Sequence, residues 1–558
     1  FTFTPVLPVT LEVDLMSLMG QMMHMPLMIS SLLTHAARHN GDVEIVSKRV
    51  EGDIHRTNYR ELAGRARKVA NALDQLKLGF SDRVATLAWN GYRHLELYFG
   101  VSGSGRVLHT INPRLHPEQI AWIVNHAEDK MLCFDLSFLP IIEAIAPHCP
   151  TVKTWVAMCD ADRMPQSNVV SLVCYEQLLA EGRKDWQWPE FDERSAVGLC
   201  YTSGTTGNPK GALYSHRSTM LHSYASALPD ALDVSARDVV LPVVPMFHVN
   251  AWGLPYSVML TGAKLVFPGP ALDGKSIYEL FEQEGVTFSA GVPTVWLSLL
   301  AHVSQNKLKF STFKRTVIGG SACPPAMMKT FRHEYGVDVV HAWGMTEMSP
   351  LGTSCTLTAK HLHLPEDAKQ SILEKQGRAI FGVDMKIVDD DGHELPWDGK
   401  TYGNLLVKGP WVIEGYFKNE GGDVLDHGWF PTGDVAVIDD EGYMQITDRS
   451  KDVIKSGGEW IGSIDLENIA VAHPSVLQAA CIGVFHPKWD ERPLLVVVKK
   501  PGMDVTKEEL LKFYEGKIAK WWTPDDVVFA ESLPLGATGK ILKNKIRETY
   551  RDYKLPTA

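Results

Sequence analysis

The sequence predicts an α/β protein with a large N-terminal domain of parallel α/β sheets plus a β-rich subdomain, and a small α/β C-terminal domain. The 558 residues are too many for one hydrophobic core, so at least two domains are expected. Short apolar segments alternate with helix-like segments before residue 376, which is typical of parallel sheets covered by helices. Beyond it, short strands separated by acidic and glycine-rich turns indicate the β-rich subdomain.

The alternation begins with the helix-like YRELAGRARKVANALDQL and the apolar strands of DRVATLAW and DKMLCFDL. It recurs in GAKLVFPG, IYELFEQEGVTFSAGVPTVWLSLLAHV, FKRTVIGGSACPPAMMKTFRHEYG and VDVVHAWG. Each apolar strand ends in a polar or glycine-rich turn, where ligands of open α/β sheets bind. Residues 239–260 carry no charge, but Pro242, Pro245 and Pro255 would break a membrane-spanning helix there. We therefore expect no transmembrane segment, and instead a buried wall of turns and short strands that suits an apolar substrate pocket.

The β-rich subdomain comprises GVDMKIVDDDGHELP, YGNLLVKGP and GWFPTGDVAVIDDEGYMQITDRS. The aspartates at 389–391 resemble a calcium loop but lack its alternating spacing, so a hairpin turn is the better interpretation. Helices are expected around residues 465–472 and 507–520 of the α/β segment that follows. We place the boundary near Arg449 to Lys451, which gives domains of residues 16–449 and 450–558.

Composition and charge disfavour several classes of function. The net charge of -11 argues against a nucleic-acid-binding protein, which would need basic patches. The eight cysteines form no C-x-x-C pair, so buried reduced thiols of a cytoplasmic protein are expected rather than disulfides or zinc ligands. The opening FTFTPVLPVTLEVDL has acidic residues where a signal peptide has basic ones. We expect an extended or processed start, with Met16 as a plausible initiator.

The segment YTSGTTGNPKG, residues 201–211, is typical of a phosphate-binding loop. Its glycines allow the backbone to approach an anion, its hydroxyls donate hydrogen bonds, and its lysine adds a positive charge. A proline precedes the lysine, so the loop differs from that of the P-loop NTPases. A flexible Ser/Thr/Gly-rich loop is the plain alternative, but the dense hydroxyls between regular elements favour phosphate. The loop residues expected to bind it are Thr202, Ser203, Gly204, Thr205, Thr206, Gly207 and Lys210.

Three further motifs carry candidate chemistry. Thr346 and Glu347 come directly after the strand-like VDVVHAWG in HAWGMTEMSP. A carboxylate there could hold Mg²⁺, although a lone glutamate after a strand is more often a surface residue. Asp434 and Arg449 offer a carboxylate and a guanidinium for two ribose hydroxyls. Lys540 follows the glycine-rich turn segment Gly-Ala-Thr-Gly of LPLGATGK, and taken alone it would be interpreted as a solvated lysine.

Taken together and in this order, the four motifs resemble the adenylate-forming superfamily of acyl-CoA synthetases, peptide-synthetase adenylation domains and firefly luciferase. The resemblance spans about residues 30 to 550. VPMFHVNAWGLPY, GVPTVW, GGSACP and IKSGGEWI look like fatty acyl-CoA synthetases. HAWGMTEMSPLGT and HPKWDERPLLVVVKK look especially like bacterial medium-chain acyl-CoA ligases and methylthiopropionate-CoA ligases. The chain departs from the family in GRAIFG, where Ala379 stands in place of a common proline.

The resemblance implies an enzyme that joins a carboxylate to the α-phosphate of Mg-ATP, releases pyrophosphate, and transfers the acyl group to CoA while AMP leaves. The implied substrate is a short- to medium-chain fatty acid, with 3-(methylthio)propionate as the alternative. Three other readings remain open: a domain that loads a carrier protein, a luciferase-like oxygenase, and a non-catalytic acyl-adenylate-binding protein. IKSGGEWI favours free CoA, and the intact Lys210, Glu347 and Lys540 speak against the non-catalytic reading. Related enzymes are often homodimers, so a homodimer is also expected.

The resemblance assigns Mg²⁺ to Thr202 and Glu347, and the α-phosphate to Thr346. Lys540 would bridge carboxylate and phosphate in the first step, and Lys451 would be the hinge about which the small domain swings. The remaining assignments are Gly320, His341, Ala342 and Trp343 for the adenine slot and acyl group; Asp434 and Arg449 for ribose; His248, Val249 and Trp252 for the acyl pocket; and Lys455, Gly457, Gly458 and Trp460 for the nucleotide and CoA after the swing.

Overall fold

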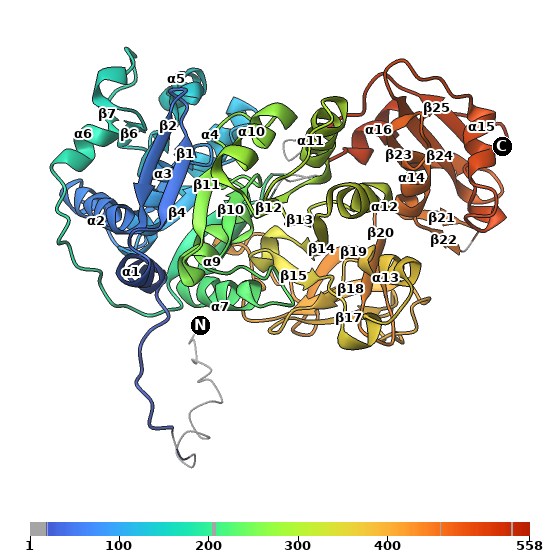
Figure 1. Cartoon of the computed structure of the whole chain (residues 1–558), viewed down its shortest axis with the longest axis horizontal. Helices are drawn as coiled ribbons and strands as arrows, with labels where there is room; N and C mark the ends of the chain where they lie inside the picture. The colour runs from blue at the N-terminus through green and yellow to red at the C-terminus, as the bar shows by residue number, and fades with distance from the viewer. Residues whose placement is uncertain (1–17, 19, 203–207, 458, 537–539) are drawn as a thin grey trace, which may run out of the picture.

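The computed structural model describes residues 18, 20–202, 208–457, 459–536 and 540–558, whose strands form four sheets (Figure 1). Met16, Gly458 and positions 203–207 of the phosphate loop lie outside the described residues. Parallel sheets, an antiparallel module and a smaller α/β C-terminal unit follow one another along the chain, so the predicted fold class is confirmed.

The first large sheet has seven described strands in the order β7-β6-β5-β3-β4-β8-β9. Neighbours run parallel except for the antiparallel β8–β9 pair, whose connection is the phosphate loop. The strands are β3 Arg83–Leu87, β4 Val107–Thr110, β5 Met131–Phe134, β6 Thr154–Ala157, β7 Leu172–Cys174, β8 Ala196–Tyr201 and β9 Gly211–Ser215. The accompanying helices are α2 Tyr59–Gln75, α3 Tyr92–Ser102, α4 Pro117–Ala127, α5 Leu139–Ile145, α6 Tyr175–Ala180 and α7 His216–Ala227.

The second large sheet has nine described strands in the order β16-β15-β14-β13-β12-β10-β11-β1-β2. Its centre is parallel, whereas β2, β15 and β16 pair antiparallel at the two edges. The strands are β1 Glu44–Lys48, β2 Ile54–Asn58, β10 Val239–Pro242, β11 Lys264–Phe267, β12 Phe288–Gly291, β13 Arg315–Ile318, β14 Asp338–Gly344, β15 Leu351–Ser354 and β16 Arg378–Ala379. The helices are α1 Ile29–His39, α9 Leu254–Thr261, α10 Gly274–Glu284, α11 Pro293–Gln305, α12 Pro325–Lys329 and α13 Glu366–Leu373.

One hydrophobic core is shared by the two large sheets. Apolar side chains of α1, α2, α3, α7 and α9 pack in it together with strand residues from both sheets. The uncharged stretch 239–260 belongs to this core and is buried as expected, but it is not wholly turns and strands. Residues 254–261 form helix α9. Pro255 does not break this helix, because it stands in the first turn, where a missing N–H costs no helical hydrogen bond.

The β-rich subdomain is the antiparallel sheet β17-β18-β19-β20, formed by Asp384–Val388, Gly403–Lys408, Phe430–Ile438 and Met444–Arg449. The predicted turn at 389–391 is present, since the Asp389 N–H donates to the His393 carbonyl at 3.0 Å. The C-terminal strands are β21 Ile454–Ser456, β22 Glu459–Ile461, β23 Val476–His486, β24 Asp490–Lys499 and β25 Asp526–Phe529; the helices are α14 Ser463–Val471, α15 Lys507–Phe513 and α16 Lys543–Thr549. The prediction for 507–520 is too long: helix α15 ends at Phe513 with Tyr514 as its C-cap, and Gly516 beyond it has a φ of +75°.

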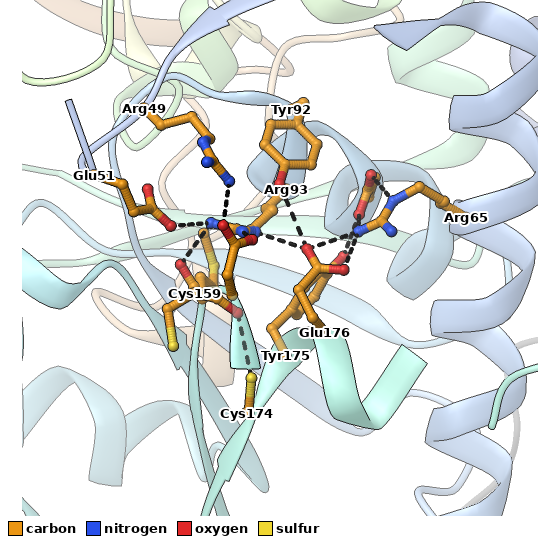
Figure 2. Close-up of polar contacts among 12 residues, drawn as sticks. Arg49, Glu51, Arg65, Tyr92, Arg93, Cys159, Cys174, Tyr175 and Glu176 are labelled. Carbon is orange, nitrogen blue, oxygen red and sulfur yellow. Dashed lines mark hydrogen bonds and ion pairs between the residues drawn. The ribbon is translucent and has the colours of Figure 1, made fainter. Parts of the chain in front are cut away.

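A buried network of ion pairs joins the edge of the nine-stranded sheet to the seven-stranded sheet (Figure 2). Arg93 of α3 is 4% exposed, and its guanidinium contacts Glu51 at 2.7 Å, Asp160 at 2.5 Å and Glu176 at 2.9 Å. These acids come from the β1–β2 turn, the segment after β6, and helix α6. Arg65 of α2 extends the network through Glu176 at 3.0 Å. The network therefore fixes elements that are distant in the sequence but flank both sheets.

The eight cysteines are buried thiols, as expected for a chain without a disulfide framework. Among the helices of the described residues, none is long and apolar enough to cross a membrane.

Candidate active site

The two ends of the phosphate loop meet at the carboxyl end of β8. The Thr202 N–H donates to the Lys210 carbonyl at 2.8 Å, and the Lys210 N–H donates to Thr202 Oγ1 at 3.2 Å. Antiparallel pairing of Tyr201 with Gly211 continues this closure into the strands. A loop of small residues is thereby anchored at the sheet edge where ligands of parallel α/β sheets bind.

Thr346 and Glu347 lie on a short 3₁₀ turn, Thr346–Met348, directly after β14. Both are buried. The Tyr214 hydroxyl donates to the Thr346 carbonyl at 2.6 Å, and the Tyr416 hydroxyl donates to Glu347 Oε1 at 2.8 Å. Burial raises the pKa of the Glu347 carboxyl, and the hydrogen bond from Tyr416 opposes that shift. The turn thus presents a carboxylate whose orientation is fixed by a neighbouring phenol.

The residues predicted for ribose and adenine meet across two sheets. Asp434 of β19 and Arg449 of β20 stand opposite one another in register, with Arg449 Nε 3.9 Å from Asp434 Oδ1. Trp343 of β14 donates from its indole Nε1 to Asp434 Oδ2 at 2.9 Å. Burial raises the pKa of Asp434, and the charge of Arg449 opposes that shift. A carboxylate, a guanidinium and an indole are therefore assembled in one place.

His341 is held more tightly than the sequence suggested. Its Nδ1 lies 3.0 Å from the Glu374 carbonyl, and the Cys323 N–H donates to its Nε2 at 3.2 Å. Burial lowers its pKa to about 4, so the ring is neutral at pH 7. Both ring nitrogens already have hydrogen-bond partners in the protein, so a ligand would contact the face or the carbon atoms of the imidazole ring.

Lys540 reaches this site from the C-terminal domain. It is partly buried, and it lies close enough to Arg449, Asp434 and Glu347 for their charges to affect its titration. Burial and then the Arg449 charge lower its pKa to about 8, against the attraction of the two carboxylates. Lys540 and Glu347, which are 193 positions apart in the sequence, therefore lie within electrostatic range of one another.

The residues predicted to act after a domain swing lie elsewhere. β21 and β22, which carry Lys455 and Trp460, are at the outer part of the C-terminal domain in Figure 1, to the side of β14 and β19. The Lys455 N–H donates to Glu491 Oε2 at 2.9 Å, and the Gly457 N–H donates to the Trp489 carbonyl at 2.8 Å. In this arrangement the backbone N–H groups of Lys455 and Gly457 form their hydrogen bonds within the C-terminal domain and not with the residues around Lys540.

The acyl-pocket candidates form a strained turn. Val249–Trp252, assigned as α8, has positive φ at all four residues, between 45° and 57°. Such non-glycine runs are costly and concentrate at functional sites. The Trp252 ring lies against Gly320, where an added Cβ would be 3.7 Å from it. Burial, then the charges of Lys540 and Arg114, lower the pKa of His248 to about 4, so its imidazole is neutral at pH 7.

Sequence reasoning missed two contributors to this site. Tyr416 was overlooked because a single tyrosine in a loop carries no spacing signal; only its tertiary contact with Glu347 reveals it. The segment 109–112 was also overlooked, yet with Leu115 it lines a small cavity that Thr202 and His248 share. Its position after β4, at the carboxyl edge of the parallel sheet, was the available signal.

The fold and the site together define an AMP-binding enzyme. The family model described as "AMP-binding enzyme" matches residues 32–417, and that described as "AMP-binding enzyme C-terminal domain" matches residues 465–540. The chain belongs to this family, and the resemblance to adenylate-forming enzymes is confirmed.

Individual relatives narrow the comparison. The chain is 56% identical over 535 residues to 3-methylmercaptopropionyl-CoA ligase of Ruegeria lacuscaerulensis. The matched region covers 96% of this chain and 99% of the relative. It is 53% identical over 538 residues to medium-chain-fatty-acid–CoA ligase of Ectopseudomonas oleovorans, with coverage of 96% and 98%. Among solved structures, ATP-bound MatB from Rhodopseudomonas palustris is similar with a TM-score of 0.79 at 27% identity, covering 95% of this chain and 100% of that one.

Proposed function

We propose that the protein is an ATP-dependent, AMP-forming acyl-CoA synthetase that activates a short- to medium-chain carboxylic acid. The observation that carries the proposal is the convergence of Lys540 with Glu347, Asp434 and Arg449 beside the phosphate loop. Two high-identity relatives named as CoA ligases support the same reaction class. The carboxylate attacks the α-phosphate, pyrophosphate leaves, and the CoA thiol then displaces AMP.

The chain's own residues would act mainly by orienting anions and neutralising charge. In the first step the Lys540 ammonium would hold the carboxylate against the α-phosphate, with Thr346 beside it. Trp343 would take the adenine and Asp434 with Arg449 the ribose. Thr202, Lys210 and the loop between them would hold the β- and γ-phosphates. No protein nucleophile is needed, because the attacking groups belong to the substrates.

The residues present also fit Mg²⁺, a cation that takes one or two carboxylates together with phosphate oxygens. Glu347 offers a buried carboxylate whose Oε1 accepts a hydrogen bond from the Tyr416 hydroxyl. The Thr202 hydroxyl lies at the loop entrance. When bound, Mg²⁺ would neutralise charge on the phosphates.

The same proposal includes two domains, 16–449 and 450–558, with Lys451 as the hinge. Contacts that cross this boundary support a defined first orientation. Asp448 Oδ2 accepts hydrogen bonds from the Ser463 N–H at 2.7 Å and from the Ser463 hydroxyl at 2.5 Å. A swing that removes Lys540 and brings Lys455 toward the nucleotide would serve the second step.

Pyrophosphate release tests the reaction class. A panel of carboxylates with ATP and Mg²⁺ is expected to give acid-dependent pyrophosphate, and addition of CoA is expected to give AMP and a thioester. Formation of ADP and phosphate, or acid-independent release, would refute the proposal. Carriage of the acid to a protein instead of CoA would support the carrier-loading alternative.

Lys540→Ala tests the division into two steps. Adenylation is expected to fall by about 100-fold or more, because a charge-stabilising group is lost, while thioester formation from supplied acyl-adenylate is largely retained. Lys545→Ala, which removes an exposed lysine paired with Glu548 on α16, is the matched control. Equal loss in both half-reactions of the Lys540 variant would contradict its assigned role.

The acid itself is the finer part of the proposal. Straight-chain fatty acids and 3-(methylthio)propionate are both unbranched apolar carboxylates, so a pocket for one would accept the other with modest loss. Comparison of kcat/KM across chain lengths and the thioether acid decides between them. A homodimer and a cytoplasmic location are further parts of the proposal; light scattering and cell fractionation test them.

A further inference from the structure

The loop between β18 and β19 encloses the turn that carries Glu347. The Ile413 N–H donates to the Glu347 carbonyl at 2.9 Å, and the Ser349 hydroxyl donates to the Trp411 carbonyl at 3.1 Å. The Tyr416 hydroxyl then donates to Glu347 Oε1 at 2.8 Å. One loop therefore holds both the backbone and the side chain of Glu347.

The same tyrosine also faces the phosphate loop. Lys210 Nζ lies 4.9 Å from the centre of the Tyr416 ring, a cation–π distance. The Lys210 side chain also runs close to Gly421 of this loop, where an added Cβ would be 3.0 Å from Nζ. Thus Tyr416 contacts the carboxylate through its hydroxyl and the ammonium through its ring, from one rigid side chain.

An ion pair and a histidine–carboxylate contact hold the segment after Tyr416 from the other side. Lys418 Nζ lies 2.6 Å from Glu128 Oε1, and His126 Nε2 lies 3.3 Å from Glu420 Oε1. Both partners come from α4 or the residue after it, in the seven-stranded sheet's helical layer. The β18–β19 loop therefore contacts the turn of Glu347 on one side and the α4 region on the other.

We propose that Tyr416 is a positioning residue that sets the distance and orientation between the Glu347 carboxylate and the Lys210 ammonium. This inference rests on the proposed function, in which these two groups hold the divalent cation and the β- and γ-phosphates. A free carboxylate could rotate and a free lysine could take many rotamers, and a shared rigid partner removes both freedoms before ATP arrives. Partners that orient a metal-binding carboxylate in this way commonly change metal affinity by 10–100-fold when removed.

Tyr416→Phe separates the two contacts, because it removes the hydroxyl and keeps the ring. With Mn²⁺ as the probe and α,β-methylene-ATP as an uncleaved nucleotide, paramagnetic resonance is expected to show about 10-fold or greater loss of Mn²⁺ affinity. Affinity for the nucleotide without metal is expected to stay within about twofold of the wild type. Tyr416→Leu, which also removes the ring, is expected to weaken metal-free nucleotide binding as well.

Tyr443→Phe is the matched control, since the Tyr443 hydroxyl donates to the Thr356 carbonyl at 2.7 Å and its residue belongs to no proposed binding group. It is expected to leave Mn²⁺ affinity unchanged. Wild-type Mn²⁺ affinity in Tyr416→Phe, or an equal loss in Tyr443→Phe, would overturn the inference. Failure of the wild-type protein to bind the metal–nucleotide pair or to release pyrophosphate would instead refute the proposed function.

Discussion

Replacing Arg93 by methionine should open the N-terminal part of the large domain locally. The Arg93 and Glu51 side chains are only 5% and 7% exposed, and Arg93 also donates to the Met158 carbonyl at 3.0 Å. Methionine keeps the apolar stem but leaves Glu51 as a buried carboxylate without its cation. Removing one member of a buried pair typically costs about 3–5 kcal/mol. If this cost lowers the free energy of opening helix α3, amide exchange in α3 becomes roughly a hundredfold to a few thousandfold faster.

Hydrogen–deuterium exchange of α3 measures this cost in the folded protein. Arg60→Met is the matched control, because Arg60 pairs with Asp42 through side chains that are 63% and 86% exposed. It should leave α3 exchange unchanged. In a Glu51→Gln background the cost of Arg93→Met should shrink by about 0.5–3 kcal/mol, the range for coupled neighbours. Strict additivity, or α3 exchange within threefold of the wild type, would refute the reasoning.

Three predictions concern the site. Because the pKa of Lys540 is lowered to about 8, its positive charge is present below that pH and lost above it, so kcat/KM for pyrophosphate release should fall above about pH 8. Lys540→Arg should remove this fall, because arginine stays charged. A wild-type kcat/KM that is constant up to pH 10 would contradict the prediction. Asp434→Ala should raise the KM for ATP by about 10-fold or more in initial-rate assays, since the indole of Trp343 loses its acceptor and the ribose its carboxylate; an unchanged KM would exclude the ribose assignment. Trp252→Ala should shift the chain-length preference toward longer acids in a kcat/KM series, because the ring against Gly320 is removed, and an unshifted optimum would exclude Trp252 from the pocket wall.

The fold class could be predicted from local patterns, and the reaction class from the family resemblance that four short motifs carry. The loop of small residues before Lys210, the glutamate after an apolar strand and the alternation of strands with helices are all recorded in short segments. Two element predictions failed where a local pattern was ambiguous. An apolar stretch with prolines proved partly helical at α9, and the helix that begins at residue 507 ends at Phe513, before the predicted residue 520. The site assignments themselves stay predictions until the variants above are measured.

The sequence by itself determined which chemical groups are available and in what order they occur. Only the tertiary structure decided which of them meet: that Lys540 lies with Asp434 and Arg449 while Lys455 does not, that both nitrogens of His341 are occupied, and that Tyr416 contacts Glu347. The physical reason is that a residue's type and local spacing fix its chemistry and secondary structure. Contacts between residues far apart in the chain depend instead on how sheets, loops and the small domain pack together, which no short segment encodes.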